Sequence, residues 1–172
     1  MSKSNQSNCT PRIGHVHLRV ADLDRAVQFY RDVLGFAVTG YGPEMGLPIA
    51  FLAAGDYHHH IGLNTFHSLD GTPPPAGHTG LHHVAILYPD RAALGVAAQR
   101  LAQHNWPIDS AEDHGATVSL YLQDPDGNGL ELYYDLPRTF WVDEGGRPVL
   151  KAERFDWHDL LPDGRRQLDK VS

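Results

Sequence analysis

The stretch HVHLRVADLDRAVQFYRDVLGF, residues 15–36, predicts a strand followed directly by a helix. Apolar and polar residues alternate from His15 to Val20, which is the period of a strand with one apolar face. Asp22 stands where the N-cap of a helix is expected, and apolar residues recur at helical spacing after it. Gly35 is typical of the residue just past a helix C-terminus. The stretch therefore predicts a β-α unit.

Three short apolar segments follow this unit, and glycine or proline residues separate them. We expect strands at 36–41, 48–54 and 58–66. The first part of the chain is therefore predicted to form a β-α-β-β-β module.

The same order of elements recurs later in the chain. In LHHVAILYPD (81–90), His83 repeats His15 and Asp90 repeats Asp22 at the same separation. A second set of elements is expected after this segment, with a helix at 90–103 and strands at 106–112, 117–123 and 129–135. The sequence DPDGNG is a strong turn signal between the last two strands. An internal repeat of this kind predicts an α+β fold of two βαβββ modules paired in one domain.

The boundaries of the domain follow from the repeat. The domain is expected at 13–136, with modules at 13–66 and 81–136, and with a linker at 67–80 that contains three consecutive prolines. Residues 1–12 are polar and are expected to be a disordered tail. Residues 137–172 form a C-terminal extension whose place the pattern does not indicate.

Composition narrows the function. The 172 residues carry a formal charge of −7, which argues against a nucleic-acid partner. The single cysteine, Cys9, excludes a disulfide framework within the chain and a cysteine-based metal site. No segment resembles a signal peptide or a membrane span, so a cytoplasmic protein with no membrane partner is expected. The 12 histidines instead suit a divalent metal or proton-transfer chemistry.

The alternation of side chains along the expected strands selects three polar residues as candidate metal ligands. His15, His83 and Glu131 each lie opposite the apolar face of an expected strand. If the two modules curl around one cavity, these side chains can converge in it. Two imidazoles and one carboxylate form the facial triad of a non-haem Fe(II) oxygenase, which leaves coordination positions open.

The segments 15–36, 81–90 and LYLQDPDGNGLELYYD (120–135) resemble the vicinal oxygen chelate superfamily, which includes glyoxalases, bleomycin resistance proteins and dioxygenases. Within it, YHHHIGLNT (57–65) is similar to small catechol 2,3-dioxygenase-like extradiol enzymes. The resemblance implies paired βαβββ modules and a metal bound by His15, His83 and Glu131. Fe(II) is the expected metal, with Mn(II) as the alternative.

The resemblance also implies catalytic residues. His60 matches the catalytic histidine of the extradiol enzymes, Tyr121 their active-site tyrosine, and His114 a histidine that contacts substrate or oxygen. His60 is expected to take a proton from the substrate and return it later. The implied reaction opens a small aromatic diol with O2.

Other functions remain open on the same fold. One is a glyoxalase-like isomerase or lyase, which normally has a further carboxylate where this chain has His60 or Gly62. Another is a metal-free small-molecule-binding resistance protein, and a third is a thiol transferase. The two modules can pair within one chain or between chains, so a homo-oligomer is also open. His59 is expected near the site, whereas His82 is expected to be structural.

Overall fold

A computed structural model describes residues 11–161 of the chain. The N-terminal tail predicted to be disordered, residues 1–12, lies outside the described residues except for its last two positions. The end of the predicted extension, from residue 162 onward, also lies outside them.

The first module forms a four-stranded sheet with the order β1-β4-β3-β2. Its elements are β1 (Val16–Arg19), α1 (Leu23–Gln28), the π-helical segment η1 (Phe29–Val33), β2 (Ala37–Tyr41), the 3-10 turn η2 (Gly42–Met45), β3 (Ile49–Ala53) and β4 (Ile61–Asn64). Asp22 caps α1 as predicted, because its carboxylate accepts a hydrogen bond from the Arg25 amide at 3.0 Å. Gly35 follows the helix with a φ of 84°, the left-handed conformation expected there.

The second module repeats this arrangement in a sheet with the order β5-β8-β7-β6-β9. Its elements are β5 (Val84–Leu87), α2 (Arg91–Gln103), β6 (Ser110–Asp113), β7 (Thr117–Gln123) and β8 (Gly129–Asp135), followed by β9 (Glu153–Arg154) from the extension. β5 pairs with β8 in parallel, just as β1 pairs with β4. The α+β fold of two βαβββ modules is therefore confirmed.

Two strands begin three or more residues later than predicted. β4 begins at Ile61 rather than at residue 58, because the triple-histidine segment before it turns instead of extending. β6 begins at Ser110 rather than at residue 106. Pro107 lies in the missing part, and a proline has no amide hydrogen to donate to a neighbouring strand.

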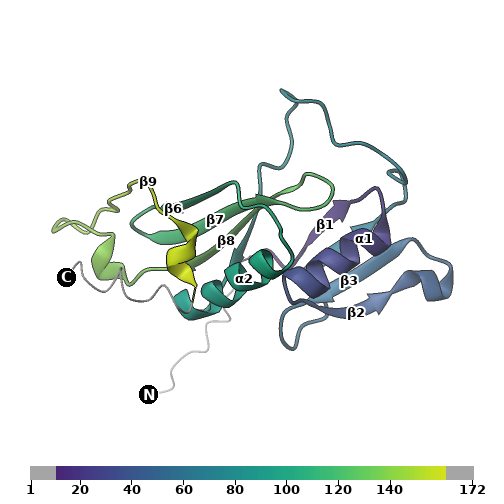
Figure 1. The fold of residues 1–172 in the computed structure, drawn as a ribbon, viewed down its shortest axis with the longest axis horizontal. Coiled ribbons are helices and arrows are strands. Elements are labelled where there is room, and N and C mark those ends of the chain that lie inside the picture. The colour runs from purple at the N-terminus through teal and green to yellow at the C-terminus, as the bar shows by residue number, and fades with distance from the viewer. Residues whose placement is uncertain (1–10, 162–172) are drawn as a thin grey trace, which may run out of the picture.

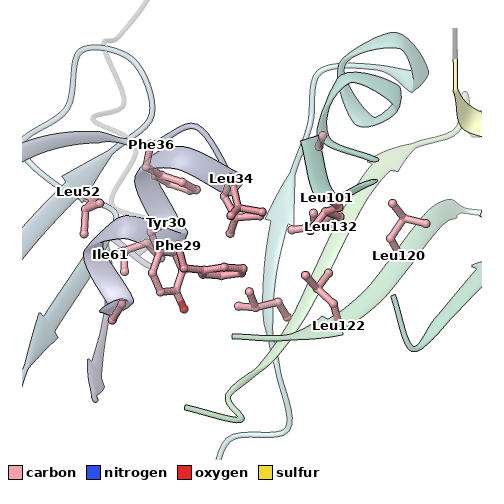
Figure 2. Close-up of a cluster of buried hydrophobic side chains, with 14 of the residues drawn as sticks. Phe29, Tyr30, Leu34, Phe36, Leu52, Ile61, Leu101, Leu120, Leu122 and Leu132 are labelled. Atoms are coloured by element: carbon pink, nitrogen blue, oxygen red, sulfur yellow. The ribbon is translucent and has the colours of Figure 1, made fainter. Parts of the chain in front are cut away.

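One hydrophobic core joins the two modules. α1 lies across the first sheet and α2 across the second (Figure 1), and their buried side chains form a single cluster. Figure 2 shows Phe29 and Tyr30 of the first module on one side of this cluster and Leu101 and Leu132 of the second on the other. The rings of Phe29 and Trp106 meet across the boundary with centroids 4.5 Å apart.

Polar contacts also hold the modules together. The DPDGNG turn of the second module reaches the helix of the first, where the Tyr30 hydroxyl donates to Asp124 Oδ2 at 3.0 Å. Asp126 Oδ1 accepts from the Ala21 amide at 2.7 Å and from Arg25 at 2.8 Å. We call these five residues the inter-module clasp. It places the end of β1 beside the start of β8.

The extension packs against the second module. It contains the 3-10 turns η3 (Arg138–Phe140) and η4 (Trp157–Leu160), and Leu160 lies against α2 with only 2% of its surface exposed. Between the two turns, β9 adds a short antiparallel strand beside β6. Within residues 11–161, no helix has the length and apolar character needed to cross a membrane.

Candidate active site

Two of the predicted metal ligands lie side by side. Ala85 on β5 pairs with Glu131 on β8, and His83 directly precedes β5. His83 Nε2 is 3.1 Å from Glu131 Oε2. Neighbouring donors around a divalent ion are about 3 Å apart when each bond to the ion is about 2.1 Å long. The donor types and their spacing at His83 and Glu131 therefore fit one ion.

Glu131 is held in place from β7. Its Oε1 accepts hydrogen bonds from Ser119 Oγ at 2.7 Å and from the Tyr121 hydroxyl at 2.9 Å. Burial, followed by the hydrogen bond to Glu131, raises the pKa of Tyr121 to about 12. Tyr121 therefore keeps its proton at neutral pH and acts as a hydrogen-bond donor.

His114 extends this network. Its Nε2 lies 2.9 Å from the Tyr121 hydroxyl, and its Nδ1 lies 3.3 Å from the backbone oxygen of Lys151. Glu112 Oε2 is 3.9 Å from the same Nε2. The structure thus brings His83, Glu131, Tyr121 and His114 together along one face of the second sheet.

A cavity of about 550 Å³ lies between the modules, where β1 and β5 approach each other. Three of the predicted site histidines line it: His15, His60 and His83. The rest of its wall is mainly apolar and includes Ile13, Val16, Phe36, Ala54, Ile61, Leu81, Val84, Ile86 and Leu87. A cavity with mostly apolar walls and a few polar groups suits a small aromatic ligand.

His60 is fixed by the backbone of its own hairpin. The Ala54 amide donates to His60 Nδ1 at 3.2 Å, and the ring packs on Tyr57 with centroids 4.7 Å apart. Because Nδ1 accepts this hydrogen bond, the proton of the neutral ring is on Nε2. His60 therefore presents a donor in this arrangement.

The structure does not gather the whole predicted triad. Across residues 11–161, no three His, Cys, Asp or Glu side chains are grouped so that they could hold an ion. His15 shares the inter-module cavity with His83, and its ring packs on His59 at 4.5 Å. Glu131 is not among the residues that line this cavity. The ligand assignment of the three residues stays a prediction.

Sequence reasoning missed two neighbours of the site. Ser119 is fully buried beside Glu131. Its place two residues before Tyr121 on the polar face of β7 is a signal that could have identified it. His82 was expected to be only structural, but its Nδ1 lies 2.9 Å from Nδ1 of His83. His59 contacts His15, in agreement with its expected place near the site.

The pairing register shows what the first module lacks. In the second module, Glu131 pairs with the residue two positions after His83. In the first module, the residue two positions after His15 pairs with Gly62. Gly62 carries no side chain, and a Cβ atom there would lie 2.8 Å from the His17 ring, so a larger residue would require the His17 side chain to move. The first module therefore has no counterpart of Glu131.

Comparison with known proteins gives a family match. The sequence profile described as "Glyoxalase/Bleomycin resistance protein/Dioxygenase superfamily" matches residues 12–132. A solved structure of a glyoxalase/dioxygenase from Nostoc punctiforme has a similar fold, with a TM-score of 0.62 and 19% sequence identity. That likeness covers 80% of this chain and 99% of the other.

The curated relatives include both dioxygenases and lactoylglutathione lyases. A catechol-2,3-dioxygenase of Bacillus subtilis is 38% identical over 87% of this chain, which spans only 50% of that protein. Biphenyl-2,3-diol 1,2-dioxygenase 3 of Rhodococcus globerulus is 36% identical over 89% of this chain and 77% of its own length. A lactoylglutathione lyase of Haemophilus influenzae is 30% identical over 70% of this chain and 90% of its own length.

Proposed function

Because the chain belongs to the Glyoxalase/Bleomycin resistance protein/Dioxygenase superfamily, we propose that it is an extradiol dioxygenase. Its substrate is a catechol-type aromatic diol, which it opens with O2. His15, His83 and Glu131 are the proposed ligands of Fe(II), with Mn(II) as the alternative metal. His60, Tyr121 and His114 are the proposed residues that act on the substrate.

The main support for this proposal is that Gly62, and not a carboxylate, pairs with His17 of β1. With no carboxylate opposite His17 in the first module, the proposed ligand set has three protein donors rather than four. A two-histidine, one-carboxylate set leaves positions for a chelating diol and for O2. The site of a glyoxalase-like lyase normally uses a fourth protein ligand, and Gly62 at this position of β4 has no side chain to supply it.

The metal, when bound, supplies Lewis acidity and electron transfer between diol and O2. The protein residues then bind and orient the ring. Apolar side chains of the inter-module cavity exclude water around it. Tyr121 holds its proton and donates a hydrogen bond to Glu131.

His60 is the residue proposed to move a proton in this reaction. With Nδ1 occupied by the Ala54 amide, Nε2 of the neutral ring carries a hydrogen. That hydrogen can form a hydrogen bond to the substrate, but a neutral imidazole does not give it up as an acid. To take a proton from the substrate at Nε2 and return it later, as expected from the sequence, the ring must first adopt the tautomer with its hydrogen on Nδ1 and lose the contact with the Ala54 amide.

Two dioxygenase relatives support this reading, since they match more of the chain at higher identity than the lyase does. A third dioxygenase relative is 30% identical over 73% of the chain, much like the lyase. The chain spans half the length of the Bacillus subtilis protein. The lyase remains the second candidate because its match is also clear.

Anaerobic loading with Fe(II), followed by addition of O2 and catechols, tests the proposal. We expect O2 uptake together with a yellow ring-opened product. His60→Ala should keep its iron and lose about a hundredfold or more in kcat, because proton transfer by a positioned side chain contributes about 10²–10⁴-fold. Turnover is measured by absorbance, and metal content by elemental analysis.

His78→Ala is the matched control, since His78 is exposed in the linker. It should behave like the wild-type protein. Activity on lactoylglutathione in a separate assay, without any opening of catechols, would reject the dioxygenase in favour of the lyase. Full turnover by His60→Ala would remove His60 from the reaction.

A further inference from the structure

Residues 149–155 of the extension run along β6 and past His114, and we call this segment the strap. β9 within it pairs with β6, so that Asp113 faces Glu153 (Figure 1). The Phe155 amide donates to the oxygen of Ala111 at 3.1 Å. The Lys151 amide donates to the oxygen of His114 at 3.2 Å. Backbone hydrogen bonds thus fix the strap along the whole edge that carries His114.

The strap is anchored at both of its ends. At its first residue, the Val149 amide donates to the oxygen of Trp141 at 2.7 Å. Beyond its last residue, Leu160 is buried against α2. At the centre, Lys151 Nζ is 2.9 Å from Asp113 Oδ2, which ties the strap to the residue before His114. The backbone of Lys151 is therefore held in a defined position beside the imidazole.

This position determines which nitrogen of His114 carries the proton. A backbone oxygen can only accept a hydrogen bond, so the contact of Lys151 O with Nδ1 requires a hydrogen on Nδ1. The neutral ring then has a free electron pair on Nε2, which faces the Tyr121 hydroxyl at 2.9 Å. The phenol proton of Tyr121 lies between two acceptors, His114 and Glu131.

Two of the dioxygenase matches reach into the extension that carries the strap. The family match ends at residue 132, before the strap begins. The lyase match covers 70% of the chain, close to the share of that family match. Two dioxygenase matches cover 87% and 89%, so wherever they begin they extend past residue 132 into the extension, whereas a third dioxygenase match covers 73%.

We propose that the strap is a positioning element of the active site, in which the backbone oxygen of Lys151 holds His114 with its proton on Nδ1 and its Nε2 toward Tyr121. The part that concerns turnover rests on the proposed dioxygenase function. The part that concerns His114 itself does not.

The test compares the wild-type protein with Lys151→Pro, which removes the amide that donates to His114. Imidazole ¹⁵N spectra of histidine-labelled protein report the tautomer, and His114→Gln identifies the signal. We expect the wild-type His114 to carry its proton on Nδ1. In Lys151→Pro the signal should move toward the Nε2–H form, and kcat should fall about tenfold because small misplacements of site groups are costly. Arg147→Ala breaks an exposed ion pair with Asp143 elsewhere in the extension. It should change neither the His114 signal nor kcat.

A second pair of variants covers the case in which Lys151→Pro does not fold. Lys151→Ala loses the contact with Asp113 and should shift the His114 signal in the same direction, whereas Lys151→Arg should restore it. A wild-type His114 with its proton on Nε2, or a signal that is the same in the proline and alanine variants as in the wild-type protein, overturns the proposal. A signal that follows the strap in a protein without dioxygenase activity supports the strap and rejects only the proposed function.

Discussion

Ser119 shows how one buried hydroxyl can control a candidate metal ligand. It has no exposed surface, and it donates to Glu131 Oε1 at 2.7 Å. Groups that hold a metal ligand in place typically change metal affinity by about 10–100-fold when they are removed. We therefore expect Ser119→Ala to weaken Fe(II) binding by about tenfold, as measured by anaerobic titration.

Thr79→Ala is a suitable control, because Thr79 is exposed in the linker. It should bind Fe(II) like the wild-type protein. If Ser119→Ala binds Fe(II) as tightly as the control does, the hydrogen bond from Ser119 has no part in metal binding.

Strand phase predicted the residues of the second sheet well. Leu120 and Leu132 are buried, and Tyr121 and Glu131 share the other face, as alternation requires. Alternation says nothing about contacts between distant backbone atoms and side chains. The hydrogen bond from Ala54 to His60 and the contact of Lys151 with His114 depend on tertiary placement, so no local pattern predicted them.

At the level of elements, the close approach of β8 to the segment before β5 positions His83 relative to Glu131. A Cβ atom on Gly129 would lie 2.2 Å from the backbone oxygen of His82 and 3.3 Å from Cβ of His83. Neither of these atoms lies at the end of a flexible side chain, so the strands themselves would have to move. We expect Gly129→Ala to destabilise the protein by about 1–3 kcal/mol. Urea unfolding measures this change.

The matched control is Gly80→Ala, because nothing lies within 4 Å of a Cβ atom at that position. Its unfolding midpoint should stay close to that of the wild-type protein. Equal stability of the two variants would show that β8 can move away from His82 without loss.

The sequence repeat predicted the elements of both modules, and β7 and β8 have the expected bounds. It could not predict the place of the extension, because the extension has no counterpart in the first module. Its position instead depends on single contacts, such as Leu160 on α2 and the pairing of β9 with β6.

In the whole molecule, the inter-module clasp and the shared core hold the two sheets in one arrangement. Tyr30 lies fully buried at the centre of both, and its hydroxyl donates to the buried Asp124. Removing one partner of a buried hydrogen bond to a charged group costs about 1.5–3 kcal/mol. Tyr30→Phe should therefore lower the free energy of unfolding by about that amount at neutral pH. Tyr41→Phe, at a partly exposed tyrosine that contacts Asp24, should have a much smaller effect.

The pH dependence of stability separates the role of the Tyr30 hydroxyl from simple packing. Burial first, and then the charge of Asp124, raise the pKa of Tyr30 well above its usual value. Its contribution is complete below about pH 10, the pKa of a tyrosine in the unfolded chain. Above that pH the unfolded chain loses the proton while the folded protein keeps it, so stability falls as pH rises. Urea unfolding between pH 8 and pH 11, values chosen to bracket about pH 10, should show a shallower loss in Tyr30→Phe than in the wild-type protein. The loss that remains is expected from Tyr88 and Tyr121, whose pKa values are each raised to about 12. If stability falls with pH as steeply in Tyr30→Phe as in the wild-type protein, Tyr30 titrates alike in the folded and unfolded states. The inter-module clasp would then not depend on the proton of Tyr30.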